Sequence, residues 1–325
     1  MILRDIALTL VETVADVTPL IPYYHVVSDD KLPHIRHLYP YKNERQFIED
    51  MDFLCRRYQP VSLGDLIESV RQGRKIKKGS FIVTFDDGYS QTYSVAAPIL
   101  FKKGIPAIFF LTTDFLDNRD LSHNNKASLI VEYMLQNAVR LRESKHPVFG
   151  TPPASPEEQA KRILAMRCQE TSLLDEMAFS IGLDFKEYLA REQPYLDSAQ
   201  IRKMIEMGFY FGAHSLSHPY FGDLSLQDQL RQALGSLQVV KDRYGLAYSV
   251  FAFPHDDRSV DIDFFRSVEK ILDLTFGTSG IKRDPIATNL QRINFERTLR
   301  PASEILLRQL TKKVLYGRSE NQRNR

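Results

Sequence analysis

The chain has 325 residues, of which 43% are hydrophobic and 26% are charged, and its formal net charge at pH 7 is +2. This composition is typical of a soluble globular protein with a large core, and the small net charge gives no general argument for binding nucleic acid or a membrane surface. The two cysteines, Cys55 and Cys168, lack the spacing of a metal site, so we interpret them as reduced, partly buried thiols.

Residues 1–16 carry apolar side chains at helical spacing, which predicts an amphipathic helix on the body of the protein. Charged residues interrupt the apolar core that a signal peptide needs, and no stretch approaches the roughly 20 apolar residues that span a bilayer. We therefore expect a cytoplasmic protein without a transmembrane segment. Peripheral contact with the inner face of the membrane stays open.

Apolar runs alternate with helical patterns over the next part of the chain. The predicted strands are 19–27, 81–85 and 105–111. The predicted helices are 44–58, 61–70 and 93–104. The polar segment 28–42 is predicted to be a loop, and the basic segment 71–78 is interpreted as a solvated connection. Because a strand, a helix and a strand at this spacing form a βαβ unit, the pattern predicts parallel pairing.

This alternation is interrupted from about residue 117 to about residue 197, where charge and proline content rise. The flanks of this region, 126–143 and 157–191, are predicted to be helical, so we interpret it as a helical insertion beside an active site. Alternation then resumes. The later predicted strands are 208–213, 248–253, 274–278 and 290–295, and the later helices are 199–207, 226–244, 261–272 and 303–316. The sequence thus predicts one domain over residues 1–316 and a polar tail at 317–325.

Polar residues follow several predicted strands at the points where the strands end. They are His25, Asp86, Asp87, His214, His218 and His255. In a parallel α/β barrel the carboxyl ends of all strands meet at one face, which is where such enzymes carry their chemistry. We therefore expect these side chains to converge in space.

Asp86 and Asp87 are adjacent acids, and Gly88 lets the backbone turn directly after them. Taken alone, this sequence is also an ordinary surface turn, and the pair His214 and His218, four residues apart, also occurs in purely structural roles. Two imidazoles with one carboxylate suit zinc, iron, cobalt or nickel and leave positions open for water. The combination at the ends of two strands therefore predicts a metal site.

Two signatures resemble the polysaccharide deacetylases of the NodB-homology type (carbohydrate esterase family 4). They are Thr84–Tyr89 (TFDDGY) and His214–His218 (HSLSH), with further similarity over 98–111, 208–220 and 251–254. The resemblance covers most of the chain apart from the helical insertion and the two ends. It implies an α/β fold, a distorted (β/α) barrel of about seven strands, to which the insertion is added.

The resemblance also implies roles for individual residues. Asp86 would be the general base. The implied ligands of a divalent metal, most simply zinc with cobalt or nickel also suitable, are Asp87, His214 and His218. Tyr24-His25 is similar to the early Tyr-His segment of permuted members, such as biofilm poly-N-acetylglucosamine deacetylases, so His25 is the expected general acid; a satisfied core histidine is the structural alternative. The usual late histidine motif is absent, which is consistent with His25 replacing it.

The sequence departs from the family pattern at His255 and Asp256, where members commonly have Tyr and Gly after a proline. The resemblance implies that Pro254, His255 and Tyr89 contact the substrate or the oxyanion. The oxyanion donor would be a backbone N–H after the proline. A surface position is the alternative for the His255 imidazole. Arg292 either pairs with a carboxylate of the site or lies on the surface.

The resemblance implies a metal-dependent hydrolase that removes an N-acetyl group from an amino sugar in a polysaccharide, an oligosaccharide or a lipid-linked glycan precursor. Two alternatives stay open: a related hydrolase of formyl amides, non-sugar amides or O-acetyl esters at the same metal site, and a non-catalytic carbohydrate-binding relative. No motif predicts a nucleophilic Ser or Cys, a phosphate-binding loop or a nucleic-acid partner. The sequence gives no indication of the oligomeric state.

Overall fold

The computed structural model describes residues 8–9, 12, 19–137 and 155–316. Most of the predicted N-terminal helix, the tail at 317–325 and the middle of the insertion lie outside the described residues. None of the described helices is both long and apolar enough to cross a membrane.

A parallel sheet forms the centre of the molecule. Its strands, in spatial order, are β10 (Ile293–Asn294), β1 (Pro22–Tyr24), β4 (Val83–Phe85), β5 (Ala107–Leu111), β6 (Tyr210–Ala213), β7 (Val250–Ala252), β8 (Leu274–Gly277) and β9 (Asn289–Gln291). A separate pair, β2 (Gln59–Pro60) with β3 (Ser80–Phe81), lies outside this sheet.

One segment closes the sheet into a barrel. β9 and β10 are separated only by Arg292, and they pair with opposite edges of the sheet. Asn289 pairs with Thr275 of β8, whereas Ile293 pairs with Pro22 of β1. The eight strands therefore correspond to seven passes of the chain, and the predicted distorted (β/α) barrel is confirmed.

Alternation along the strands separates the barrel interior from its outer layer. The interior is filled by Ile21, Ile82, Ile108, Phe110, Val250, Ala252, Leu274 and Phe276, together with Leu63, Leu66 and Ile67 of α3 (Leu63–Arg71). Because Ile21 and Ile82 precede β1 and β4, helix α3 packs against the amino ends of the strands. This end of the barrel is opposite to the end where the predicted site residues lie.

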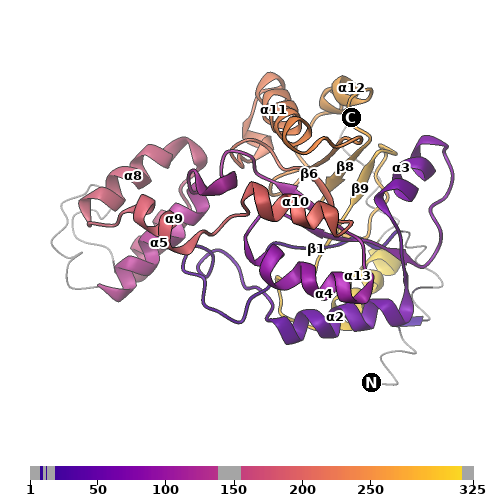
Figure 1. The fold of residues 1–325 in the computed structure, drawn as a ribbon, viewed down its shortest axis with the longest axis horizontal. Coiled ribbons are helices and arrows are strands. Elements are labelled where there is room, and N and C mark those ends of the chain that lie inside the picture. The colour runs from indigo at the N-terminus through magenta and orange to yellow at the C-terminus, as the bar shows by residue number, and fades with distance from the viewer. Residues whose placement is uncertain (1–7, 10–11, 13–18, 138–154, 317–325) are drawn as a thin grey trace.

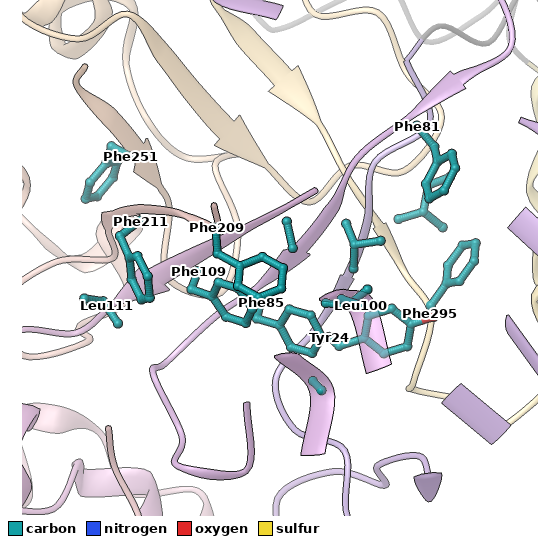
Figure 2. Close-up of a cluster of buried hydrophobic side chains, with 14 of the residues drawn as sticks. Tyr24, Phe81, Phe85, Leu100, Phe109, Leu111, Phe209, Phe211, Phe251 and Phe295 are labelled. Carbon is teal, nitrogen blue, oxygen red and sulfur yellow. The ribbon is translucent and has the colours of Figure 1, made fainter. Parts of the chain in front are cut away.

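The outer face of the sheet carries a row of aromatic rings (Figure 2). Tyr24, Phe85, Phe109 and Phe211 are register partners on β1, β4, β5 and β6, and neighbouring rings stack at centroid distances of 5.7, 5.0 and 5.5 Å. A one-residue slip would turn these rings toward the other face, so the row fixes the register. It thereby sets the positions of the residues that follow at the strand ends.

Helices cover this outer face (Figure 1). They are α2 (Glu44–Arg57), α4 (Ala97–Lys103), α10 (Ser198–Glu206), α11 (Leu226–Tyr244), α12 (Ile262–Val268) and α13 (Ala302–Tyr316). Helix α11 has the predicted bounds. Before α4, residues Thr92–Ala96 form a π-helical segment, which widens the helix next to Pro98, a residue without an N–H.

The insertion forms a lobe at one end of the molecule (Figure 1). Its described helices are α5 (His123–Gln136), α7 (Pro156–Leu164), α8 (Thr171–Ser180) and α9 (Phe185–Glu192). Residues 157–191 are largely helical, as predicted, but they form three separate helices. A 3₁₀ turn at Cys168–Glu170 separates α7 from α8, and α8 ends before Gly182, whose φ of +75° ends a helix without strain.

Truncation of a ring in the aromatic row should destabilise the fold, because neighbouring strands cannot collapse into the space that it leaves. We expect Phe109→Ala to lower the free energy of unfolding by about 3–5 kcal/mol in urea titrations. Phe179→Ala is the matched control, since this ring is 88% exposed, and it should change stability by less than about 0.5 kcal/mol. Equal effects of the two variants would contradict the role of the row.

Candidate active site

A cavity of about 500 Å³ lies at the carboxyl ends of the barrel strands. Among the residues that the sequence predicted, it is lined by His25, Asp86, Asp87, Tyr89, His214, His218 and His255. Pro254 is buried and Arg292 is fully buried behind Asp86, so neither lines the cavity. The strand-end residues therefore converge, as the barrel geometry requires.

The turn after β4 sends the two neighbouring acids in different directions. The Asp86 N–H donates to the Tyr24 carbonyl across the sheet, at 3.0 Å, and thereby keeps Asp86 in line with the strand. Asp87 then adopts a φ of +71° and Gly88 one of +76°. A positive φ is uncommon for a non-glycine residue and is often found at functional sites. As a result, Asp86 faces Arg292, and Asp87 faces two imidazoles.

Arg292 binds Asp86 through two parallel hydrogen bonds, Nη1 to Oδ1 at 2.6 Å and Nη2 to Oδ2 at 2.8 Å. Its Nε donates to the Gly277 carbonyl at 3.2 Å, and its guanidinium lies over the rings of Tyr23 and Phe110. Burial alone would raise the pKa of Asp86, but the charge and hydrogen bonds of Arg292, together with the nearby His214 and His25, outweigh burial and lower the pKa below its ordinary value. Asp86 is therefore a carboxylate at neutral pH.

Asp87, His214 and His218 each offer one ligand atom, and these atoms lie within 4.8 Å of one another. The Asp87 Oδ1 is 3.1 Å from the His218 Nε2 and 3.5 Å from the His214 Nε2. The His214 Nδ1 lies 2.9 Å from the Ala252 carbonyl, which can only accept, so Nδ1 carries the proton and Nε2 presents a lone pair. Burial lowers the pKa of His214 to about 4, so this ring is neutral.

The His214 Nε2 lone pair and the His218 Nε2 both face the Asp87 carboxylate. The Asp87 Oδ1 is buried and accepts no hydrogen bond from the residues that the structure describes. Burial would raise the pKa of Asp87, but the nearby imidazoles, His218 first, hold it well below its ordinary value. Converging nitrogen and carboxylate donors are what a divalent cation needs, and the His214–Ala252 bond is the usual outer contact of a metal-bound imidazole. The residues present therefore fit a metal ion.

The turn that carries both imidazoles is fixed by local hydrogen bonds. Ser215 and His218 have φ values of +74° and +61°, and the Ser215 Oγ accepts from the His218 N–H. Gln232 of α11 accepts from the next two backbone N–H groups, of Leu216 and Ser217. The two histidines are thus directed by a tight turn rather than by a helix.

His25 pairs with Glu296, a residue that the sequence analysis did not identify. Glu296 accepts from the His25 backbone N–H at 3.0 Å and forms an ion pair with the ring Nδ1. Burial lowers the pKa of His25, but the charge and hydrogen bond of Glu296, together with the charges of Asp87 and Asp86, outweigh burial and raise the pKa to about 9. Glu296 comes just after β10. The rule that polar residues follow strand ends would therefore have found it.

Further lining residues come from the loop at 28–42 and from the insertion, which was expected beside the site, although no sequence pattern singled out these individual residues. They include His37, Tyr39, Ser122, Asn124, Asn125 and Leu164. The Tyr39 ring lies against His25 at a centroid distance of 4.6 Å. Tyr89 stacks on Tyr195 and accepts from the Asn125 amide at 3.0 Å, so it joins the insertion to the barrel at the side of the cavity.

His255 lies exposed beside the mouth of the cavity, with its ring 4.7 Å from that of His218. Its φ is +60°. Its backbone N–H donates no hydrogen bond to any residue in the described part of the chain. The position after Pro254 thus presents an unused donor at the site as well as an imidazole.

A sequence profile of the polysaccharide deacetylase family matches residues 73–275, which is more than half of the chain. The chain belongs to this family. Family membership makes it a hydrolase of the carbohydrate-deacetylating class. A search among curated protein sequences finds no match.

Solved structures share the fold. The deacetylase PplD of Streptococcus pyogenes, in complex with acetate, is 15% identical with a TM-score of 0.56, over 90% of this chain and 97% of that one. IcaB of Ammonifex degensii is 16% identical with a TM-score of 0.54, over 89% and 96%. A de-N-acetylase of Aggregatibacter actinomycetemcomitans is 13% identical with a TM-score of 0.52, over 86% and 95%.

Replacement of Glu296 should change the titration of His25. We expect Glu296→Gln to lower the pKa of His25 from about 9, because the charge of Glu296 is removed and only the smaller effects of Asp87 and Asp86 then oppose burial. Histidine NMR titration measures this shift, with Glu269→Gln on the exposed end of α12 as the control.

The same pair makes stability depend on pH. Because the folded pKa of His25 lies above the unfolded value, its contribution is fully present below pH 6.5 and is lost as the pH rises through about 9. Glu296→Gln should weaken this dependence, because it removes the largest interaction that raises the pKa of His25. An unchanged His25 titration in the variant would show that Glu296 does not control its proton.

Proposed function

We propose that this protein removes the N-acetyl group from an acetylated amino sugar, with a divalent metal held by Asp87, His214 and His218. The observation that carries the proposal is the meeting of three differently charged groups in one cavity: a metal-type donor set, an ionised Asp86 and a protonated His25. Hydrolysis of an amide needs a Lewis acid or oxyanion donor, a base and an acid. Each requirement has a candidate here.

A cation bound by these ligands would supply Lewis acidity toward the acetyl carbonyl and toward water. Zinc is the first choice for a donor set of two imidazoles and one carboxylate, and cobalt or nickel also suit it. The residues of the chain supply the base, the acid and the backbone donor to the oxyanion.

Asp86 accepts the proton of the attacking water in this proposal. Arg292 keeps Asp86 ionised and fixes both of its oxygens, so the carboxylate keeps one orientation throughout the reaction. The same ion pair reduces the basicity of Asp86. Proton transfer to Asp86 would therefore depend on the acidity that a bound cation would supply to the water.

His25 donates a proton to the leaving amine nitrogen, since an amide nitrogen is a poor leaving group without one. The Glu296 carboxylate keeps the imidazole protonated at neutral pH and holds its orientation. The free backbone N–H of His255 is the candidate donor to the oxyanion.

The proposed substrate is a polysaccharide, an oligosaccharide or a lipid-linked glycan precursor that carries N-acetylated amino sugars. Polar and aromatic lining residues such as Tyr39 and Asn124 suit a sugar ring, which has hydroxyl groups at its edge and apolar faces. The complex of PplD with acetate, the product of deacetylation, supports an acetyl group as the part removed.

Two substitutions should separate the roles of the adjacent acids. We expect Asp87→Ala to lose both bound metal and activity. Asp86→Asn should retain metal but lose about 10²–10⁴-fold in kcat, because only proton transfer is removed. Acetate release from chitooligosaccharides and metal analysis of the purified protein give the two readouts.

Asp114→Asn is the matched control, because Asp114 also follows a strand but is exposed and lies outside the cavity lining. It should leave metal and activity unchanged. Full activity of Asp86→Asn would contradict the assignment of the base. An O-acetylated sugar assayed in parallel tests the esterase alternative, and hydrolysis of that ester alone would reject the amidase assignment.

We also propose that the protein works in the cytoplasm, on a glycan precursor rather than on an external polymer. Cys55 is exposed, Cys168 is half-buried, and neither forms a disulfide; unpaired thiols of this kind persist in a reducing compartment. Fractionation of the native host with thiol labelling should recover the chain in the cytosolic fraction with both cysteines reduced. Recovery from periplasmic or secreted fractions would reject the location.

A further inference from the structure

A second cavity, of about 610 Å³, lies at the opposite end of the barrel. It opens between the segments 73–78 and 280–287, beside Pro19 and Ile21, which precede β1. The catalytic cavity is lined by residues that follow the strands, so the packed barrel interior and α3 separate the two. We call this second space the basal cavity.

The lining of the basal cavity is strongly basic. It includes Arg74, Lys75, Lys77, Lys78, Lys282, Arg283 and Lys313. The acid among its lining residues is Asp284, whose Oδ2 accepts hydrogen bonds from the amides of Asn289 and Gln291. A chain with a formal net charge of +2 thus concentrates positive charge at this one place.

Most of this charge lacks a compensating carboxylate. Lys75, Lys78, Lys282 and Arg283 form no ion pair with any residue that the structure describes. Arg74 pairs with Glu68 at 3.2 Å, but both side chains are 60% exposed, and such pairs contribute little. Positive groups brought together without partners repel one another, and an anionic ligand would relieve that repulsion.

The cavity is also lined by apolar side chains. Val70, Ile76, Ile281, Ile286, Leu290 and Ile21 line it. Ile76, Ile281, Ile286 and Leu290 are each partly exposed. A pocket of this size that combines apolar walls with a few charged groups has the form of a small-molecule site.

We propose that the basal cavity binds a phosphate or pyrophosphate group carried by an apolar or aromatic body. The lysine and arginine side chains of 74–78 and 282–283 would hold the phosphate oxygens, and the isoleucines and Leu290 would contact the body. Two sources share this chemistry: a soluble nucleotide and a phospholipid at a membrane surface. Binding at a membrane would leave the catalytic cavity facing away from the bilayer.

The test uses the whole chain and two variants of equal charge change. The site variant is Lys75→Gln/Lys282→Gln/Arg283→Gln. The control is Arg56→Gln/Lys102→Gln/Lys203→Gln, three exposed basic residues of α2, α4 and α10 that lie outside the basal cavity. Calorimetry with inorganic pyrophosphate and with uridine diphosphate tests the soluble source. Co-sedimentation with phosphatidylcholine vesicles, with and without phosphatidylglycerol, tests the lipid source.

We expect the unmodified chain to bind at least one of these probes, and the site variant to lose affinity on the order of tenfold or more, because several Lys or Arg contacts are removed together. The control variant should keep the affinity of the unmodified chain. Loss of nucleotide or pyrophosphate binding assigns the soluble source, and loss of phosphatidylglycerol-dependent sedimentation assigns the lipid. No binding to any probe, or equal behaviour of the two variants, would overturn the proposal.

Hydrogen exchange on the unmodified chain tests binding in the basal cavity without a substitution. Saturation with the bound probe should slow exchange in the segments 73–78 and 280–287. Protection confined to the catalytic cavity, with no change in these two segments, would overturn the proposal.

Discussion

The ion pair between Arg292 and Asp86 joins the closure of the barrel to the assembly of its site. Arg292 stands where the chain passes from β9 to β10, the segment that joins the two edges of the sheet. Moving both charges out of water costs several kcal/mol per ion, so the pair is stable only with good geometry and further contacts. Two parallel hydrogen bonds, the Gly277 carbonyl and the two aromatic faces supply them. The Asp86 carboxylate therefore has its partner only when the barrel is closed.

In the cavity at the carboxyl ends of the strands, Asp86 and His25 keep opposite charges because each has its own partner of opposite charge. Asp86 has Arg292 and His25 has Glu296, so a carboxylate and an imidazolium coexist in one cavity. Asp87 lies instead against His214 and His218, with which it forms the metal-type donor set. The two adjacent acids of one sequence motif thus differ chemically because different side chains surround them. A positive φ at Asp87 is the backbone feature that makes the division possible.

The two ends of the barrel have different character. The cavity at the carboxyl ends of the strands is lined by acids and histidines and partly by the insertion. The cavity at the amino ends is lined by lysines, arginines and apolar side chains. Strand β9 connects the two regions along the chain, because Gln291 lines the basal cavity and the next residue, Arg292, holds Asp86. A connection that sequence patterning indicated only as a solvated turn, residues 71–78, becomes one wall of this second cavity.

The sequence by itself determined the barrel, its main elements and the residues at the strand ends, because these depend on local periodicity and on short motifs. The Asp-Asp-Gly turn, the two histidines of the HSLSH segment and His25 could all be read in this way. Only the tertiary structure decided which charged residue pairs with Asp86 and which pairs with His25. Asp86 and Arg292 are 206 residues apart and His25 and Glu296 are 271 apart, so no local pattern relates them. Their pairing depends on which strands become neighbours when β9 and β10 close the sheet, and that is a property of the whole fold.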